Sequence, residues 1–158
     1  MSELKPLSRG RYFEDMEVGD TIVTAGRTIT EADIVNFAGL SGDYNQIHTD
    51  AQYAAEQGGF GKRVAHGLLI QSIASGLAVQ TGFIERTVLA FRELETKMSL
   101  PVFIGDTIHV VIDVVEKKAY KRLGGGNVMM KLAITNQDGK VVQRGKWTML
   151  IMSKPGEA

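Results

Sequence analysis

Residues 66–82 read HGLLIQSIASGLAVQTG and form the most apolar long stretch of the chain. Apolar residues fall on nearly every side of a helical projection, yet the stretch is too short to span a bilayer. We therefore predict a helix that is buried in the protein core. Its polar positions are ordered, because Gly67, Gln71 and Ser75 recur every fourth residue and so share one helical face. This stripe, with Ser72 beside it, predicts that the helix borders a cavity.

The chain after this helix changes to extended patterns. Four segments combine Val, Ile, Thr and Met with partial two-residue alternation: residues 87–98, 106–116, 127–135 and 141–152. Pro101 with Gly105-Asp106, the Gly124–Gly126 run and Asn136–Gly139 supply turn residues between them. We predict antiparallel hairpins. With helices early and strands late, the pattern indicates an α+β domain whose antiparallel sheet wraps around the one long apolar helix.

The segment before the apolar helix carries signals for one strand and one helix. Residues 21–24 are a candidate first strand, although Gly26 weakens its continuation. Thr30 and Asp33 resemble a capping box with the shorter acid, and the apolar spacing that follows is helical. Gly39 and Gly42 are predicted to stop this helix.

Composition limits the classes of protein to which the chain can belong. Its 158 residues fit a single domain, 1–158, with residues 1–10 as a flexible or extended leader. Without cysteine it has no disulfide, thiolate zinc site or cysteine nucleophile. Eighteen basic and eighteen acidic residues balance, so no overall field steers it to nucleic acid or a membrane. No signal-peptide core is visible, and we expect a cytoplasmic protein.

The stretch SGDYNQIH, residues 41–48, concentrates polar chemistry directly after the predicted helix end. Asp43 and His48 could hold and activate a water molecule, and the Asn45 amide could orient either side chain. The alternative is that Asp43 and Asn45 only form Asx turns, and spacing alone favours it. Thr49 and Gln52 offer a second capping box, which places His48 just before a short helix over residues 50–56.

A second candidate region, residues 63–67, leads into the apolar helix. N–H groups at a helix start are unpaired and partly positive, so the Gly67 N–H could bind a developing oxyanion. Alternatively, Gly67 packs a tight helix entry and His66 bonds a carbonyl, which is the favoured role for His66. Three scattered histidines without cysteine lack metal-ligand spacing, so we predict no metal.

Two apparent binding motifs are set aside. Residues 58–63 suggest a phosphate loop, but Glu56 and Arg63 occupy the positions of its first glycine and its hydroxyl residue. The basic residues between 117 and 122, near Tyr120, could contact phosphates, although a solvated hairpin end explains them more simply.

Three motifs together resemble the MaoC-like family. FAGLSGDYNQIH at 37–48 resembles the signature F-A-x-L-S-G-D-x-N-P-[LIV]-H, RVAHGLL at 63–69 resembles R-[IV]-[AV]-H-G-[ML]-L, and PVFIGD at 101–106 resembles P-V-x-x-G-D. Their order and spacing agree along nearly the whole chain. The resemblance implies a hot-dog fold, in which an antiparallel sheet wraps one long apolar helix, and a homodimer or higher homo-oligomer with sheets joined edge to edge.

The resemblance also implies an activity. Family members include (R)-specific enoyl-CoA hydratases and related dehydratases, which add water to an acyl thioester or remove it. By position, Asp43 and His48 would be catalytic, Asn45 supporting, and the Gly67 N–H the donor to the thioester carbonyl; Ser75 would line the acyl pocket. No metal or redox cofactor is implied, because coenzyme A is part of the substrate.

The chain departs from the family signature at one position. Gln46 replaces the usual proline, which would restrict Asn45 to extended backbone geometry. This replacement bears on the substrate more than on Asp43 and His48, and a polar or branched acyl chain is one possibility. The alternatives to a hydratase are an acyl-CoA thioesterase of the same fold and a non-catalytic acyl-binding module.

Overall fold

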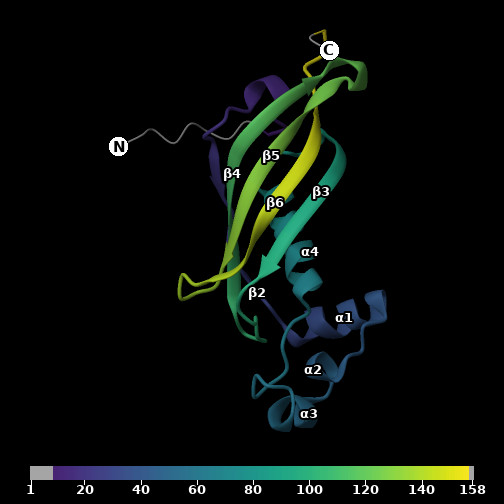
Figure 1. Cartoon of the computed structure of the whole chain (residues 1–158), viewed down its shortest axis with the longest axis vertical. Helices are drawn as coiled ribbons and strands as arrows, with labels where there is room; N and C mark the ends of the chain where they lie inside the picture. The colour runs from purple at the N-terminus through teal and green to yellow at the C-terminus, as the bar shows by residue number, and fades with distance from the viewer. Residues whose placement is uncertain (1–8, 157–158) are drawn as a thin grey trace.

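Four long strands form the body of an antiparallel sheet (Figure 1). The computed structural model describes residues 9–156. The strands are β3 (Val88–Met98), β4 (Thr107–Tyr120), β5 (Gly125–Thr135) and β6 (Val141–Met152). All four predicted segments are confirmed, with β4 running four residues beyond its predicted end. Neighbours in the sheet follow the order β1-β4-β5-β6-β3, which leaves β3 at one edge.

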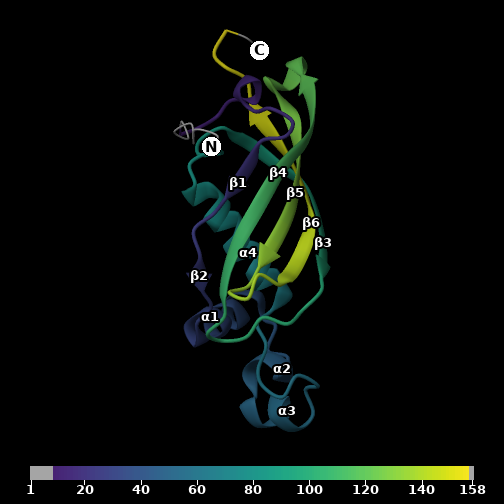
Figure 2. The ribbon, with the colours of Figure 1, turned by 90° about the vertical axis from the view of Figure 1, so that its left-hand side faces the viewer.

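Two short strands lie on the opposite side of the sheet, along β4 (Figure 2). β1 (Thr21–Val23) confirms the predicted first strand and pairs with residues 111–113. β2 (Arg27–Thr28) was not predicted, because it is only two residues long and follows Gly26. It pairs with Ile108 and Thr107, so it continues the edge that β1 begins.

The apolar stretch forms α4 (Gly67–Gln80), which lies against one face of the curved sheet (Figures 1 and 2). Ile70, Ala74 and Ala78 of α4 are at most 1% exposed and belong to the same core cluster as Ile112 and Trp147 of the sheet. The prediction of a buried helix wrapped by a sheet is therefore confirmed, and the fold class is α+β.

The polar stripe on α4 does not share one environment. Gln71 is buried and hydrogen-bonds to side chains of the sheet. Ser75 is half buried, and its hydroxyl donates to the Ser72 carbonyl at 2.7 Å. Gly67 lines a cavity that is described below. The prediction that the helix borders a cavity is therefore confirmed at Gly67 and at Ser72, which lines a second hollow, whereas the sheet covers Gln71.

Three helices lie beyond one end of the sheet: α1 (Glu31–Ser41), α2 (Gln46–Thr49) and α3 (Ala51–Glu56) (Figure 1). The Thr30–Asp33 capping box of α1 is confirmed: Thr30 Oγ1 accepts the Asp33 N–H, and Asp33 Oδ2 accepts the Thr30 N–H at 2.8 Å. Gly42 ends the helix with φ of 76°, a left-handed conformation that favours glycine. Gly39 lies inside the helix and does not end it.

Two predictions near α2 are wrong. The N-cap of α3 is Asp50 rather than Thr49, because Asp50 Oδ1 accepts the Tyr53 N–H at 2.9 Å, whereas the Thr49 hydroxyl donates back to the Tyr44 carbonyl. His48 does not precede a helix but lies within the single turn of α2. Short consecutive helices with several Asp, Asn and Thr residues leave the choice of cap open in the sequence.

The remaining elements are the short 3-10 helices η1 (Phe13–Asp15) and η2 (Lys121–Leu123). Most of the predicted leader, residues 1–10, lies outside the described residues. Its last residue, Gly10, donates its N–H to the Gly82 carbonyl just after α4. Among residues 9–156, no helix combines the length and apolarity that a membrane crossing requires.

Candidate active site

The connection from α1 to α2 is built from side-chain-to-backbone hydrogen bonds. Ser41 Oγ accepts the Asp43 N–H at 3.1 Å, Asp43 Oδ1 accepts the Asn45 N–H at 3.2 Å, and Asn45 Oδ1 accepts the Ile47 N–H at 3.4 Å. The Asx-turn interpretation of Asp43 and Asn45 is therefore correct. These bonds use only one carboxylate oxygen of Asp43, and the other remains available for chemistry.

His48 is held with one ring nitrogen toward that second oxygen. The residue is 8% exposed, and its Nδ1 lies 2.7 Å from the Val64 carbonyl. A carbonyl can only accept, so Nδ1 carries a proton, and in the neutral ring Nε2 then presents a lone pair. Nε2 lies 4.0 Å from Asp43 Oδ2, and the Asp43 side chain is 52% exposed. This separation is too long for a direct hydrogen bond and suits a shared water molecule.

His66 supports both residues. Its Nε2 lies 2.9 Å from the Asp43 carbonyl, which confirms that His66 bonds a carbonyl. Its ring stacks on the His48 ring, with centroids 3.8 Å apart and planes at 26°, and Phe37 contacts its ring at 5.1 Å. His66 Nδ1 is buried without a hydrogen-bond partner among the described residues. Nothing in the spacing of His48 and His66, eighteen positions apart, signals this contact.

The three residues Asp43, His48 and His66 form the cluster closest to a metal site in the described part of the chain. Their potential ligand atoms lie within 4.8 Å of one another, so two of the three histidines predicted to be scattered lie together. However, Asp43 Oδ2 and His48 Nε2 are 4.0 Å apart, whereas two ligands of tetrahedral zinc are roughly 3.3 Å apart. Stacked imidazoles also direct their lone pairs side by side rather than toward one point. The geometry therefore suits water better than a metal.

A cavity of about 280 Å³ adjoins this cluster. His48 and Gly67 both line it, together with Ile70, Met98 and Gln143. Gly67 is the first residue of α4, where N–H groups have no intrahelical acceptor and carry partial positive charge. A methyl group at Gly67 would overlap the flexible end of the Met98 side chain, which would have to move to accommodate it. The structure thus places a histidine and a helix N-terminus on one cavity.

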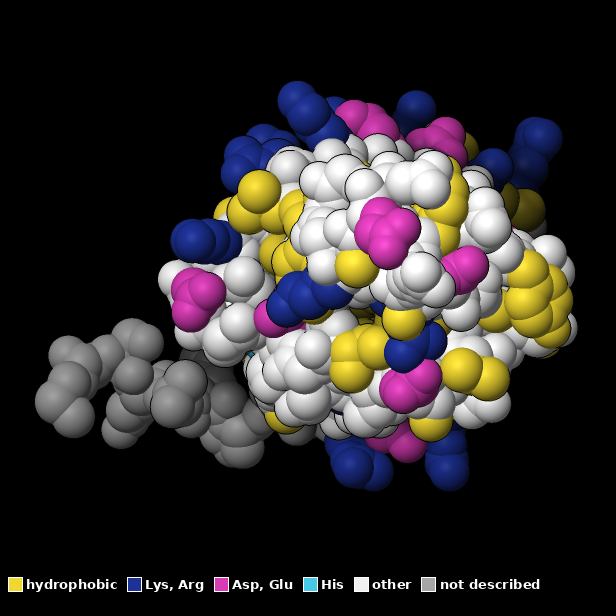
Figure 3. All heavy atoms as spheres, turned by 90° about the horizontal axis from the view of Figure 1, so that it is seen from below, with side chains coloured by type: hydrophobic (Ala, Val, Ile, Leu, Met, Phe, Trp, Pro, Cys, Tyr) yellow, Lys and Arg dark blue, Asp and Glu magenta, His cyan; other side chains and the backbone are white. Residues whose placement is uncertain are grey.

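Charged side chains of both signs are interspersed around the α1–α3 end of the molecule (Figure 3). Almost no histidine surface shows in this view, in agreement with the burial of His48 and His66. The basic residues near Tyr120 are partly engaged by aromatic rings: Lys118 lies 5.5 Å from the Tyr120 ring centroid, and Lys117 lies 4.5 Å from that of Phe13.

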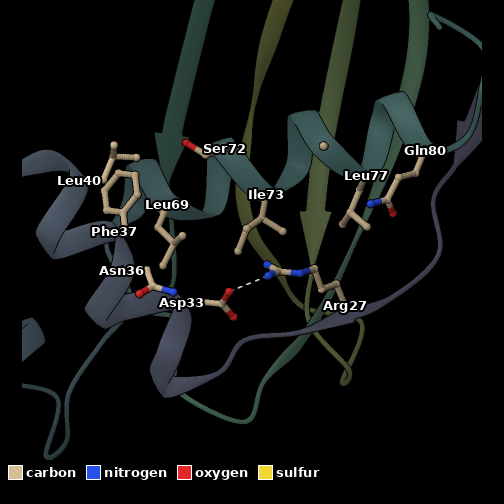
Figure 4. Close-up of a pocket in the computed structure, with 11 residues that line it drawn as sticks. Arg27, Asp33, Asn36, Phe37, Leu40, Leu69, Ser72, Ile73, Leu77 and Gln80 are labelled. Carbon is tan, nitrogen blue, oxygen red and sulfur yellow. Dashed lines mark hydrogen bonds and ion pairs between the residues drawn. The ribbon is translucent and has the colours of Figure 1, made fainter.

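A second hollow, of about 420 Å³, lies between α1 and α4 (Figure 4). Leu69, Ile73 and Leu77 point into it from α4, facing the Arg27–Asp33 ion pair of 2.6 Å. Phe37 lines this hollow, and its ring also contacts the ring of His66, so Phe37 lies between the hollow and the histidine cluster. Ser75 lines neither hollow, and its assignment to an acyl pocket stays a prediction.

Comparison with known proteins identifies the family. A family model described as MaoC like domain matches residues 14–135. This chain belongs to the MaoC-like family. Protein MaoC of Klebsiella aerogenes is 48% identical over 101 residues, which cover 63% of this chain but only 29% of that protein. An (R)-specific enoyl-CoA hydratase of Rhodospirillum rubrum is 32% identical over 143 residues, covering 90% of this chain and 93% of that enzyme.

Solved structures of similar proteins agree with the fold. A monoamine oxidase regulatory protein from Archaeoglobus superimposes with a TM-score of 0.86 at 37% identity, covering 94% of this chain and 99% of that one. A Mycobacterium tuberculosis protein described as having a double hot-dog fold superimposes with a TM-score of 0.82 at 18% identity, covering 94% of this chain and 46% of that one. The predicted hot-dog fold is therefore confirmed.

Proposed function

We propose that this MaoC-like chain is a hydro-lyase that adds water to an enoyl-CoA thioester, or removes it from a 3-hydroxyacyl-CoA. The observation that carries the proposal is the pair Asp43 Oδ2 and His48 Nε2, 4.0 Å apart, next to a cavity that His48 and Gly67 line. Names of relatives support the reaction class: (R)-specific enoyl-CoA hydratase at 32% identity and 3-hydroxybutyryl-CoA dehydratase at 36% identity.

Asp43 and His48 would share the water molecule that reacts. Both groups present acceptor atoms, because Val64 holds the His48 proton on Nδ1. In hydration, either Asp43 or His48 takes a proton from the water molecule while the water oxygen bonds to the β-carbon. The same pair of side chains then delivers a proton to the α-carbon. Asn45 supports this geometry by donating its N–H to the Asp43 carboxylate and by capping α2.

Gly67 would stabilise the charge that develops during this addition. As the β-carbon accepts oxygen, electron density moves onto the thioester oxygen, and a preorganised N–H donor at that oxygen lowers the barrier. The helix N-terminus adds a favourable dipole at the same place. Since the thioester itself accepts the electrons, the proposed reaction uses no metal or redox cofactor, and coenzyme A enters only as part of the substrate.

One assay separates this proposal from its rivals. The protein is incubated with crotonyl-CoA, while the absorbance of the conjugated thioester and the release of free thiol are followed separately. Loss of the absorbance without thiol supports a hydratase. Thiol release without hydration would instead establish the alternative, an acyl-CoA thioesterase. If crotonyl-CoA binds but neither signal changes, the chain is a non-catalytic acyl-binding module.

We also propose that two copies of the chain associate through β3. This strand is the sheet edge, and unpaired edges are sites where a second strand can add. Leu94, opposite the buried Trp147, is 49% exposed, and Phe91 and Met98 are 42% and 50% exposed. On the flank of α4, Leu68 and Val79 are also about half exposed. A second copy that extends the sheet at β3 would cover these exposed apolar side chains.

A further inference from the structure

A series of buried hydrogen bonds runs from the sheet to the start of α4. Trp147 Nε1 donates to Gln71 Oε1 at 3.3 Å, Gln71 Nε2 donates to Gln143 Oε1 at 2.7 Å, and Gln143 Nε2 donates to the Gly67 carbonyl at 2.9 Å. Trp147 is 1% exposed, Gln71 is 6% exposed and Gln143 is 2% exposed. The series therefore joins β6 and α4 inside the core and ends on Gly67.

The two ends of this series fix the orientation of both amides. An indole N–H can only donate, so Gln71 must present its oxygen to Trp147. A backbone carbonyl can only accept, so Gln143 must present its nitrogen to Gly67. Flipping either amide would set two donors or two acceptors against each other in a buried site, which is costly. The second N–H of Gln71 donates to the Thr96 hydroxyl at 2.9 Å, so the Gln71 nitrogen is fully used.

Gly67 needs such an anchor more than other residues do. Without a side chain, it has no rotamer or Cβ packing to restrict its backbone, and it stands at a helix terminus, where structure frays. Met98 packs over it, and Gln143 bonds its carbonyl. Because Gln143 lines the same cavity as His48, the bond acts at the edge of the site itself.

We infer that Gln143, oriented by Gln71, is a positioning residue: by bonding the Gly67 carbonyl it holds the first residue of α4 in place, and with it the Gly67 N–H beside the thioester oxygen. This inference rests on the proposed hydratase function. Displacing a reacting group by about 1 Å can lower a rate by about a hundredfold. A buried amide that only stabilises the fold would change the stability of the protein without changing how the carbonyl of a bound thioester is polarised.

The test compares Gln143→Leu, which cannot donate to Gly67, with the wild type and with Thr24→Val. Thr24 is a matched control, because its buried hydroxyl accepts the Val110 N–H at 2.9 Å in a distant part of the sheet. Hydration of crotonyl-CoA gives kcat and KM. The infrared C=O stretch of carbonyl-labelled butanoyl-CoA, which cannot be hydrated, reports the hydrogen bond to the bound thioester. Thermal unfolding of all three proteins is measured in parallel.

We expect Gln143→Leu to lower kcat by about tenfold to a hundredfold with KM within about twofold, and to lose part of the C=O shift of bound butanoyl-CoA. Thr24→Val should lose a comparable amount of thermal stability but keep the wild-type kcat and the wild-type C=O shift of bound butanoyl-CoA. The inference is overturned if Gln143→Leu keeps the wild-type kcat and C=O shift, or if Thr24→Val loses as much kcat. If Gln143→Leu does not fold, Gln143→Glu is used in its place. Its protonated form can donate to Gly67, so its activity relative to wild type should rise as pH falls, and a constant ratio overturns the inference.

Failure of the proposed function is a separate result. If the wild type does not hydrate crotonyl-CoA, the hydratase proposal fails whatever the variants do. If the wild type is active and the Gln143 variants match its kcat and C=O shift, the hydratase proposal stands and the positioning role of Gln143 falls.

Discussion

Asp43 uses its two carboxylate oxygens for different purposes. Oδ1 accepts the Asn45 N–H and holds the turn, while Oδ2 lies 4.0 Å from His48 Nε2. Turn formation and proposed catalysis are therefore compatible in one residue. The turn fixes the carboxylate, and His66 bonds the carbonyl of the same residue, so the proposed site is rigid before substrate binds.

The charge on Asp43 can be removed without removing the turn. In Asp43→Asn, the amide oxygen can still accept the Asn45 N–H, so we expect normal folding but a kcat for crotonyl-CoA hydration that is about 10²- to 10⁴-fold lower. His48→Ala should have a similar effect on kcat. Steady-state hydration rates and thermal unfolding would measure both.

Asp50→Asn is the matched control for this pair. It replaces a nearby carboxylate that caps α3, and Asn caps helices about as well as Asp. It should therefore retain activity. Full hydration activity in both Asp43→Asn and His48→Ala would show that the proposed catalytic pair is wrong.

Met98 limits the space next to Gly67. Its side chain lines the 280 Å³ cavity and packs over Gly67, so Met98→Ala should enlarge the cavity. We expect kcat/KM for an eight-carbon enoyl-CoA, relative to crotonyl-CoA, to rise by about tenfold. Met129→Ala, on β5 and outside this cavity, is the control. An unchanged chain-length preference in Met98→Ala would mean that the acyl chain lies elsewhere.

At the scale of elements, α1 depends on Asp33 for its start. Burial raises the pKa of Asp33, but hydrogen bonds from the Thr30 N–H and hydroxyl, and then Arg27, outweigh it, so the pKa is lowered overall. A carboxyl with a lowered folded-state pKa stabilises the protein above its ordinary pKa of about 4, and this contribution is lost as pH falls through the folded-state value.

Asp33→Ala should reveal this contribution. We expect it to lower the free energy of unfolding by about 1 kcal/mol at pH 7, and the difference from wild type to shrink below about pH 4. Urea unfolding at pH 7 and at pH 3 measures the difference in the free energy of unfolding between the variant and the wild type at each pH. Glu31, whose Oε1 lies 2.6 Å from an Arg63 nitrogen but which is largely exposed, provides the control variant Glu31→Ala. A difference between Asp33→Ala and wild type that does not vary with pH contradicts the assignment.

The structure explains the departure at Gln46. This residue is exposed and begins α2, and the first helical position needs no N–H donor, which is why proline is common there. Asn45 has φ of −51° and ψ of 135°, close to polyproline II geometry, which is allowed before proline. Gln46 does not line the cavity beside His48, so the structure gives no support for a polar acyl chain read by Gln46.

Gln46→Pro should therefore stabilise the protein. Since the folded backbone already suits proline, the substitution mainly restricts the unfolded chain and should add about 0.4–1 kcal/mol to the free energy of unfolding. Urea unfolding measures the gain, and crotonyl-CoA hydration should be unchanged. Gln57→Pro, at the C-cap of α3, is the contrasting variant and should destabilise, because the Gln57 N–H donates to the Tyr53 carbonyl and its φ of −129° does not suit proline. A loss of stability in Gln46→Pro would show that the Gln46 N–H is needed.

At the scale of the whole molecule, the exposed β3 edge predicts a dimer. Leu94→Asp places a charge in the proposed interface and should raise the dimer dissociation constant by at least about thirtyfold, as truncation of a central interface residue does. Sedimentation velocity across a range of concentrations measures this change. Val18→Asp, at a residue that is 62% exposed outside the sheet, is the control. A wild-type protein that remains monomeric at high concentration contradicts the proposed interface.

Features predicted correctly from sequence depend on neighbouring residues. The buried helix follows from the apolar run at 66–82, the long strands from alternation and turn residues, and the start of α1 from Thr30 and Asp33, three positions apart. Where local signals compete, prediction was wrong: Thr49 and Asp50 could both cap α3, and only Asp50 does. The two-residue strand β2 was missed because its pairing with β4 is not local.

By itself, the sequence determined the fold class, the family resemblance and the identity of the candidate catalytic residues, since periodicity, capping and motifs lie within short segments. Only the tertiary structure decided how those residues meet. His48 bonds a carbonyl sixteen positions away and stacks on His66, and Gln71 bonds Gln143 seventy-two positions away. Such contacts depend on how the sheet and α4 pack together, and packing brings together residues whose separation in the chain carries no signal.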